Sequence, residues 1–233
     1  MSDYFISHLE ELRKRLIVSL IAFLAASILA YFFSSPLLDF LTEPLRRFDQ
    51  TALYFRRPFD AFVTHIKVAA TAGFIFSTPV IFSQIWLFVK PGLYEDEKKI
   101  FASLTVISVI LFLAGAAFAY YAAIPFGLHF LLSFQTEGLK PLLEVGPYFS
   151  FVVGMIFGFG ILFDFPVMIL GLVKLGAVNS VTLAKSRKVI IVLIFIAAAI
   201  LTPSPDPVSQ LFLAGPLILL FEVSLAVARL IEK

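Results

Sequence analysis

The stretch LIVSLIAFLAASILAYFF, from Leu16 to Phe33, decides the fold, because it runs for 18 residues without a charge. A helix needs about 20 apolar residues to cross a hydrocarbon core of roughly 30 Å. The whole chain has this character, since 60% of its 233 residues are hydrophobic and only 15% are charged, whereas about 25% are charged in soluble domains. Together with a net charge of only +2, this composition argues against disorder, fibrous structure and nucleic-acid binding.

Six apolar runs predict an all-α, multi-pass membrane protein with a single transmembrane domain over residues 1–233. Residues 1–15 are expected to form an amphipathic segment, and the spans are expected at residues 16–33, 66–89, 100–132, 149–173, 189–201 and 211–228. The fifth and sixth helices are short, at roughly 20 and 27 Å. Pro125 and Gly127 are expected to bend or end the third helix. Pro79 interrupts the second and frees a backbone carbonyl that neighbouring helices must satisfy.

The distribution of Lys and Arg predicts the orientation of the chain, because cytoplasmic loops are richer in both. Twelve lie on the side of the N-terminus: Arg13, Lys14, Arg15, Lys90, Lys98, Lys99, Lys174, Lys185, Arg187, Lys188, Arg229 and Lys233. Five lie opposite, namely Arg46, Arg47, Arg56, Arg57 and Lys140. Both termini are therefore expected in the cytoplasm. The four Arg of the first external loop, residues 34–65, are an exception to this distribution that charge alone does not explain. The loop is long enough to contain short interfacial helices.

The cytoplasmic N-terminal segment carries two carboxylates with different interpretations. Ser7 and Glu10 have the spacing of a capping box, which predicts that a helix begins at Ser7 and gives Glu10 a structural role. Glu11 lies four residues before Arg15, so the alternatives for Glu11 are a surface ion pair or a functional carboxylate.

A second acidic group, Glu95, Asp96 and Glu97, occupies the loop between the second and third runs. These residues either complement the macrodipole of the following helix or form a clamp for a basic partner, since guanidinium groups make bidentate contacts with carboxylates. The aromatic residues Trp86, Phe88 and Tyr94 lie nearby in the sequence. They either hold apolar residues that flank a basic motif or anchor the chain at the membrane interface.

Two acidic residues lie within apolar runs, where a charge is costly and points to function. Asp164 shares one face of a helix with Gly160 and Gly171. This face is either a helix-packing seam, since Gly154 and Gly158 have GxxxG spacing, or the wall of a polar cavity. The presence of an acid favours the cavity. Glu222 shares its helical face with Gly215 and Arg229, and an internal ion pair at the cytoplasmic end is the alternative to a functional role.

The sequence contains no pattern that is typical of catalysis or of cofactor binding. There is no Cys, and His8, His65 and His129 lie in different segments without ligand spacing, which predicts neither a metal site nor a cofactor. The chain has no HExxH motif and no glycine-rich phosphate loop. We therefore expect a protein that is not an enzyme.

Three strings resemble the TatC family, the polytopic component of the twin-arginine protein translocase. They are HLEELRKRL (residues 8–16), FVKPGLYEDEKK (residues 88–99) and LTP (residues 201–203), followed by Asp206 and by Phe221-Glu222. The resemblance covers nearly the whole chain. It implies six spans in a concave bundle in the inner (cytoplasmic) membrane, with both termini in the cytoplasm.

The resemblance also implies roles for individual residues. Glu97 is the main carboxylate for the arginine pair of a signal peptide, and Glu11, Arg13 and Phe88, with the neighbouring Glu95 and Asp96, belong to the same recognition patch. Phe62, Pro79 and Gln84 belong to the path where signal peptides insert and partner helices dock. Asp164 stands where the family usually has Glu, and Asp206 lies in an external hairpin.

The function implied is that of a signal-peptide receptor and assembly core for the export of folded proteins. Its expected partners are twin-arginine signal peptides, single-span proteins of the TatA and TatB types, membrane lipid and further copies of itself. One alternative is a proton-coupled transporter of a small solute that uses Asp164, although transporters usually show internal repeats, which this chain lacks. The other is a passive scaffold whose acids all form internal ion pairs.

Overall fold

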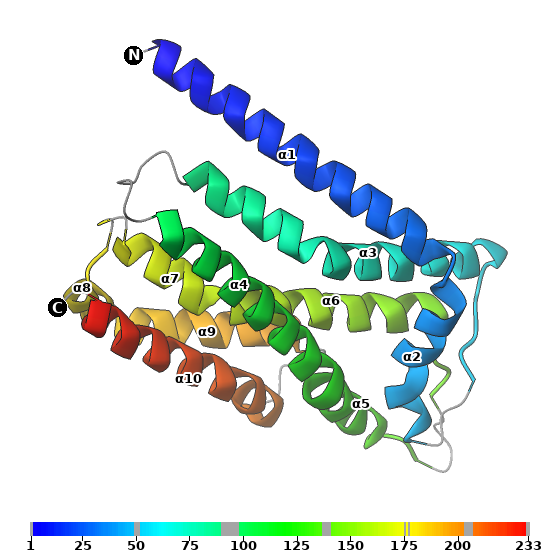
Figure 1. Ribbon diagram of the computed structural model, residues 1–233. Helices are drawn as coiled ribbons and strands as arrows, with labels where there is room; N and C mark the ends of the chain where they lie inside the picture. The colour runs from blue at the N-terminus through cyan, green and yellow to red at the C-terminus, as the bar shows by residue number, and fades with distance from the viewer. Residues whose placement is uncertain are drawn as a thin grey trace. The chain divides into compact units, whose positions relative to one another are not determined.

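The structure is almost entirely helical (Figure 1), which confirms the all-α prediction. It is a computed structural model that describes residues 2–48, 52–89, 98–136, 141–174, 176, 178–202 and 207–231. The helices are α1 (Ser2–Tyr31), α2 (Ser34–Arg46), α3 (Pro58–Val89), α4 (Lys98–Phe118), the π-helix η3 (Ala119–Ala123), α5 (Ile124–Leu132), α6 (Val145–Phe163), α7 (Phe165–Lys174), α8 (Ser180–Lys185), α9 (Arg187–Leu201) and α10 (Pro207–Ile231).

Among the described residues, five helical segments are long and apolar enough to cross a membrane: His8–Tyr31, Pro58–Val89, Ala102–Leu132, Val145–Lys174 and Ser209–Leu230. The fifth predicted run forms α9, whose 15 residues are short, as expected. The prediction of a short sixth helix is wrong, because α10 has 25 residues. Its first residue is Pro207, whose fixed φ suits the first position of a helix.

The predicted capping box at Ser7 is also wrong. Helix α1 begins at Ser2, so Ser7 lies inside the helix and cannot be its N-cap. Residues 2–6 contain neither Gly nor Pro, and nothing in them stops the helix from extending toward the N-terminus. As a result α1 is one continuous helix of 30 residues and not a separate amphipathic segment followed by a span.

The chain divides into two compact units, and the first comprises Met1–Phe40 and Phe62–Ile110. Within this unit α1 and α3 run antiparallel (Figure 1), and they approach closely at Gly73. A Cβ atom on Gly73 would lie 2.5 Å from the Cα of Ser27, so only glycine fits. Ala30, Ala69 and Ala72 form a buried cluster of small side chains beside this contact, which is how membrane helices bring their backbones together.

Side-chain hydrogen bonds tie α3 to α4 and to α2 in the first unit. The indole nitrogen of the buried Trp86 donates to Ser108 Oγ in α4 at 3.2 Å. His65 Nδ1 lies 2.9 Å from the hydroxyl of Ser34, at the start of α2. Trp86 is therefore a packing residue, and both interpretations of its role at the membrane surface are wrong.

Pro79 does not break α3, because a neighbouring side chain replaces the missing hydrogen bond. A proline at position 79 has no N–H for the carbonyl of Ile75. The hydroxyl of Thr78 donates to that carbonyl at 2.7 Å. The expectation that other helices must satisfy the freed carbonyl is therefore wrong, because α3 satisfies it internally.

The second unit comprises Leu41–Ala61 and Leu111–Lys233. Here the third predicted run changes its helical form just before Pro125, because Ile124 N–H bonds the carbonyl of Ala119, five residues earlier, in η3. α10 packs against both α7 and α9. Phe112, Phe149, Phe159 and Phe221 are fully buried and form much of the core.

The segment that follows α1 is held to α6 and to the residues before it through Leu41 and Tyr54. The hydroxyl of Tyr148 donates to the carbonyl of Leu41 in α2 at 2.7 Å, and an isolated β-bridge joins Tyr54 to Glu144. Three of the four unexplained Arg contact acidic residues in this unit. Arg46 lies 3.6 Å from Glu43, Arg56 lies 3.9 Å from Glu144, and the backbone N–H of Arg57 donates to Asp60 Oδ2 at 3.0 Å. The short helix expected in this loop is α2.

Replacing Gly73 by alanine is expected to destabilise the first unit by about 1–3 kcal/mol, because the new methyl group overlaps the backbone of Ser27. The measurement is the midpoint of thermal unfolding in detergent. Gly154→Ala is the matched control, since nothing lies within 4 Å of its added Cβ. Equal shifts in the two variants would contradict a tight crossing at Gly73.

Replacing Thr78 by valine is expected to cost about 1–3 kcal/mol, because the carbonyl of Ile75 loses its donor. Ser83→Ala is the control, since Ser83 donates to Val80, whose carbonyl also has the ordinary helical partner four residues later. Thermal unfolding in detergent again measures the difference. A Thr78→Val chain as stable as the Ser83→Ala chain would show that the hydroxyl does not support α3.

Candidate functional site

The first polar site lies where the beginning of α1 meets the end of α3. Arg15 Nη2 lies 3.2 Å from Glu11 Oε1, one helical turn away. Arg15 Nη1 donates to Gln84 Oε1 of α3, also at 3.2 Å. The side chains of Arg15 and Glu11 are 28% and 29% exposed, so the pair is partly screened from water but reachable from it.

An aromatic contact lies on the same two helices. The rings of His8 and Phe88 stack with their centroids 4.4 Å apart and an angle of 26° between their planes. We call His8, Glu11, Arg15, Gln84 and Phe88 the α1–α3 site. It combines a carboxylate, a guanidinium and an amide with an aromatic surface.

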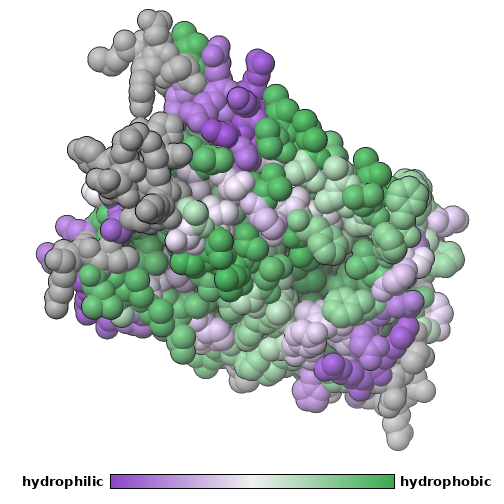
Figure 2. Space-filling model, in the orientation of Figure 1, coloured by the Kyte–Doolittle hydropathy of each residue, from purple (hydrophilic) through white to green (hydrophobic). Residues whose placement is uncertain are grey.

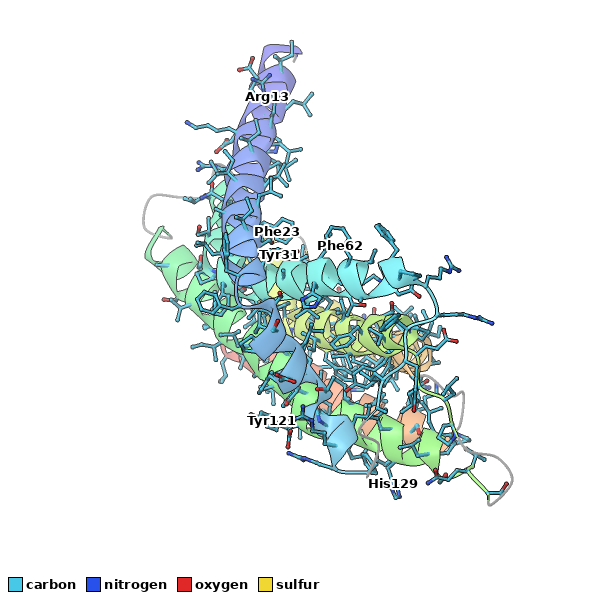
Figure 3. The ribbon with its side chains drawn as sticks, turned by 90° about the vertical axis from the view of Figure 1, so that its right-hand side faces the viewer. Arg13, Phe23, Tyr31, Phe62, Tyr121 and His129 are labelled. Carbon is cyan, nitrogen blue, oxygen red and sulfur yellow. The ribbon has the colours of Figure 1, made fainter. Side chains whose placement is uncertain are left out.

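The structure separates the predicted recognition residues into two groups. It brings Glu11 and Phe88 into the α1–α3 site, and the predicted i,i+4 pair of Glu11 with Arg15 is present. Arg13 is exposed near the start of α1 (Figure 3). It lies two residues from Glu11, which places it on a different side of the helix. Figure 2 shows the hydrophilic residues of α1 gathered near this end and apolar side chains along the rest.

Sequence reasoning missed His8 and Arg15 as members of the site. The spacing of His8, Glu11 and Arg15 contained the signal, because separations of three and four residues place them on one face of a helix. Gln84 was predicted in the insertion path and lies in the α1–α3 site, where it contacts Arg15.

The other residues of the predicted insertion path lie elsewhere on α3. Phe62 is near the start of that helix (Figure 3), about 33 Å along its axis from Gln84. Pro79 is exposed in the second half of the helix. The predicted residues Glu95, Asp96, Glu97 and Asp206 lie outside the described residues.

The sequence predicts one helix over residues 149–173, but the structure interrupts this helix at Asp164. α6 ends at Phe163 and α7 begins at Phe165. The cause is Pro166, which lacks the N–H that would bond the carbonyl of Leu162. Asp164 is only 5% exposed, and its two carboxylate oxygens have no hydrogen-bond partner within the part of the chain that the structure describes.

The surroundings of Asp164 fit neither sequence interpretation in full. Gly160 packs on the ring of Phe112, and Gly158 packs on Leu201, whereas nothing lies within 4 Å of a Cβ on Gly154. Close packing thus explains why Gly158 and Gly160 are glycines. Gly154 and Gly158 do not form the predicted GxxxG seam, because Gly154 has no close neighbour. The groove described near this break is apolar, with a volume of about 210 Å³ and with Leu162 and Phe165 in its lining, where the sequence favoured a polar cavity.

Glu222 forms an ion pair, but not with the residue on its own helix that the sequence indicated. Its Oε2 accepts a hydrogen bond from Arg187 Nη2, at the start of α9, at 2.8 Å. The side chains of Arg187 and Glu222 are 46% and 40% exposed, so the pair is a surface contact. The prediction of an ion pair is right in kind, and Arg229 is the wrong partner.

These features define a multi-pass, α-helical membrane protein with an accessible polar site on α1 and α3 and with a buried acid, Asp164. No group of three metal-ligating side chains lies close together in the described ranges. A family model described as Sec-independent protein translocase protein (TatC) matches residues 7–216. The chain belongs to the TatC family, which confirms the resemblance.

Two known relatives and a solved structure match this chain over nearly their whole length. The TatC protein of Carboxydothermus hydrogenoformans is 39% identical over 225 residues, which cover 97% of this chain and 92% of that protein. The TatC protein of Aquifex aeolicus is 39% identical over 97% of this chain and 95% of its own length. A crystal structure of the twin arginine translocase receptor TatC in DDM has a TM-score of 0.84 and 39% identity, and the match covers 95% of this chain and 99% of that one.

Family membership decides the class of function. The chain is a multi-pass membrane component of the Sec-independent protein translocase and not an enzyme. The alternative of a small-solute transporter that uses Asp164 receives no support from these relatives.

Replacing Asp164 by asparagine separates a stabilising role from a functional one. An unpaired buried carboxylate is costly, so Asn is expected to leave the free energy of unfolding unchanged or to raise it by about 1–2 kcal/mol. If the acid is retained for function, export of a folded substrate falls although the protein is no less stable. Thermal unfolding and an export assay measure the two effects. A clear loss of stability would instead show that Asp164 supports the fold.

Proposed function

We propose that this chain is the receptor for twin-arginine signal peptides and the assembly core of its translocase in the inner (cytoplasmic) membrane. In this proposal both termini and the α1–α3 site face the cytoplasm, where folded substrates arrive. The observation that carries it is the half-buried contact of Glu11 with a guanidinium, which Arg15 provides from within the chain.

The chemistry of the α1–α3 site suits a short basic segment with apolar neighbours. A carboxylate takes a guanidinium through charge-assisted hydrogen bonds. The stacked rings of His8 and Phe88 offer a flat aromatic surface on the same pair of helices for the residues that flank the arginines. An arginine pair needs more than one carboxylate. Glu97, with Glu95 and Asp96, follows Phe88 by fewer than ten residues and is proposed to supply the rest.

Other predicted residues are proposed to serve assembly. Phe62 and Pro79 are exposed on α3. They are proposed to contact helices within the lipid, namely an inserting signal peptide and single-span partners of the TatA and TatB types. Asp164 is proposed to meet a polar group of such a partner, because its carboxylate is buried without a hydrogen bond from the described residues. Arg13 is proposed to add to the recognition patch, Asp206 to act in the external hairpin, and Glu222 to hold α10 to α9 through Arg187. Further copies of the chain complete the complex.

A photo-crosslinker at Phe88 tests the receptor function directly. A twin-arginine precursor is expected to label strongly and its twin-lysine version weakly, because an ammonium cannot reproduce the forked geometry of a guanidinium. Glu11→Gln is expected to lower the affinity for the twin-arginine peptide about 10-fold to 100-fold, because one hydrogen bond to a charged group is lost.

A crosslinker at Phe76, an exposed residue on the same helix, is the matched control and is expected to label less. Equal labelling by the two precursors, together with unchanged affinity in both Glu11→Gln and Glu97→Lys, would favour the passive scaffold instead.

A further inference from the structure

The apolar groove in the second unit follows one face of α9. The residues that α9 contributes to its lining are Ile190, Leu193, Ile194 and Ala197. Their separations of three and four residues place them on one side of the helix, over about 10 Å of its length. α6, α7 and α10 add one residue each, namely Leu162, Phe165 and Leu217. Leu193 is exposed and Ile194 is buried, so the groove leads from the surface of the unit toward its interior.

The groove has room for a hydrocarbon chain but not for a helix. Its volume is about 210 Å³. One turn of an α-helix is about 10 Å across and 5.4 Å long, and it fills roughly 420 Å³. An apolar cavity of about 150 Å³ holds a molecule of benzene, so the groove has room for roughly eight carbon atoms. A flexible acyl chain can therefore enter where a whole transmembrane helix cannot.

Basic residues surround the end of the groove at which α9 begins. Lys185, Arg187 and Lys188 are all exposed. Arg187 lies three residues before Ile190, which places it on the face of α9 that lines the groove. Figure 1 shows this end of α9 beside α8, the end of α7 and the end of α10. The apolar groove thus begins next to a cluster of positive charge.

Glu222 holds one of these cations but does not neutralise the cluster. Its carboxylate accepts a hydrogen bond from Arg187 Nη2 at 2.8 Å, which fixes the guanidinium between α9 and α10. A guanidinium has five donors, so Arg187 can bind a second anion while it keeps Glu222. Lys185 and Lys188 leave this end of the groove positively charged. Residues 165–221 contain a single acid, Asp206, which follows the opposite end of α9 in the sequence.

We propose that this groove binds one anionic phospholipid, with an acyl chain against α9 and the phosphate against Arg187 and Lys188. Basic pockets between membrane helices bind anionic head groups, and a guanidinium binds phosphate through charge-assisted hydrogen bonds. Arg187 is one helical turn from Ile190, so a single lipid reaches both the charge and the groove. The site uses no residue of the α1–α3 site and is independent of the receptor function.

α9 is the helix that gains most from such a lipid. Only Ile194 and Ala198 of its 15 residues are buried by the rest of the protein. An acyl chain in the groove adds apolar contacts to α9, α7 and α10 together. Because the groove exists only in the folded chain, a lipid that binds there also stabilises the fold.

The test titrates the purified full chain in detergent with phosphatidylglycerol and, separately, with phosphatidylcholine that has the same acyl chains. Native mass spectrometry counts the bound lipids. One phosphatidylglycerol is expected to bind about 10-fold to 30-fold tighter than phosphatidylcholine, because Arg187 and Lys188 attract a net negative head group.

Two pairs of variants separate the head group from the acyl chain. Lys188→Gln is expected to weaken binding of phosphatidylglycerol about fivefold, whereas Lys14→Gln, at an exposed position on a helix that does not line the groove, is expected to leave it unchanged. Ala197→Phe fills the groove and is expected to weaken binding about tenfold or more, since buried methylene groups of the chain lose their contacts. Ala199→Phe, at an exposed position of α9 outside the groove, is its control and is expected to change little.

Equal affinity for the two lipids would overturn the proposal, as would equal losses in Lys188→Gln and Lys14→Gln. Unchanged binding of phosphatidylglycerol by Ala197→Phe would overturn it as well. If that variant instead lowers crosslinking to a single-span partner, the groove takes a side chain of a partner helix and not a lipid. Lys188 is exposed, so Lys188→Gln keeps the test decisive if Ala197→Phe does not fold.

Discussion

The close approach of α1 and α3 at Gly73 is the contact on which the α1–α3 site depends. It leaves no room for a Cβ atom next to Ser27 and is extended by buried alanines on both helices. Because the two helices are antiparallel, a contact near the end of α1 also brings the beginning of α1 beside the end of α3. Two small residues within the membrane segment thereby allow His8 to reach Phe88 and Arg15 to reach Gln84.

Prolines shape several of the helices, because a membrane leaves no water to satisfy a freed carbonyl. Three of these prolines are accommodated in three different ways. At Pro79 a threonine hydroxyl replaces the missing donor, before Pro125 the hydrogen bonds shift to the π pattern, and before Pro166 the helix ends and restarts. The third solution is the one that places an acid, Asp164, at the interruption.

The sequence was most informative where the relevant interaction is local. Apolar runs located the helices, and the four-residue spacing of Glu11 and Arg15 predicted their pair. It could not predict that Arg15 also contacts Gln84, 69 residues away, or that Glu222 pairs with Arg187 and not Arg229, since such contacts depend on how helices pack. Trp86 was misjudged for the same reason, as its partner Ser108 lies on another helix. The interruption at Asp164 is different, because Pro166 was visible and was overlooked.

The length of α9 has a consequence for the surrounding lipid. Its 15 residues span about 22 Å, whereas the hydrocarbon core is roughly 30 Å thick. Hydrophobic mismatch of this size deforms the acyl chains beside the helix or draws its polar ends inward, at a cost of fractions of a kcal/mol for each Å. A helix of this length can therefore cross the bilayer only where the hydrocarbon layer is locally thinner than its average.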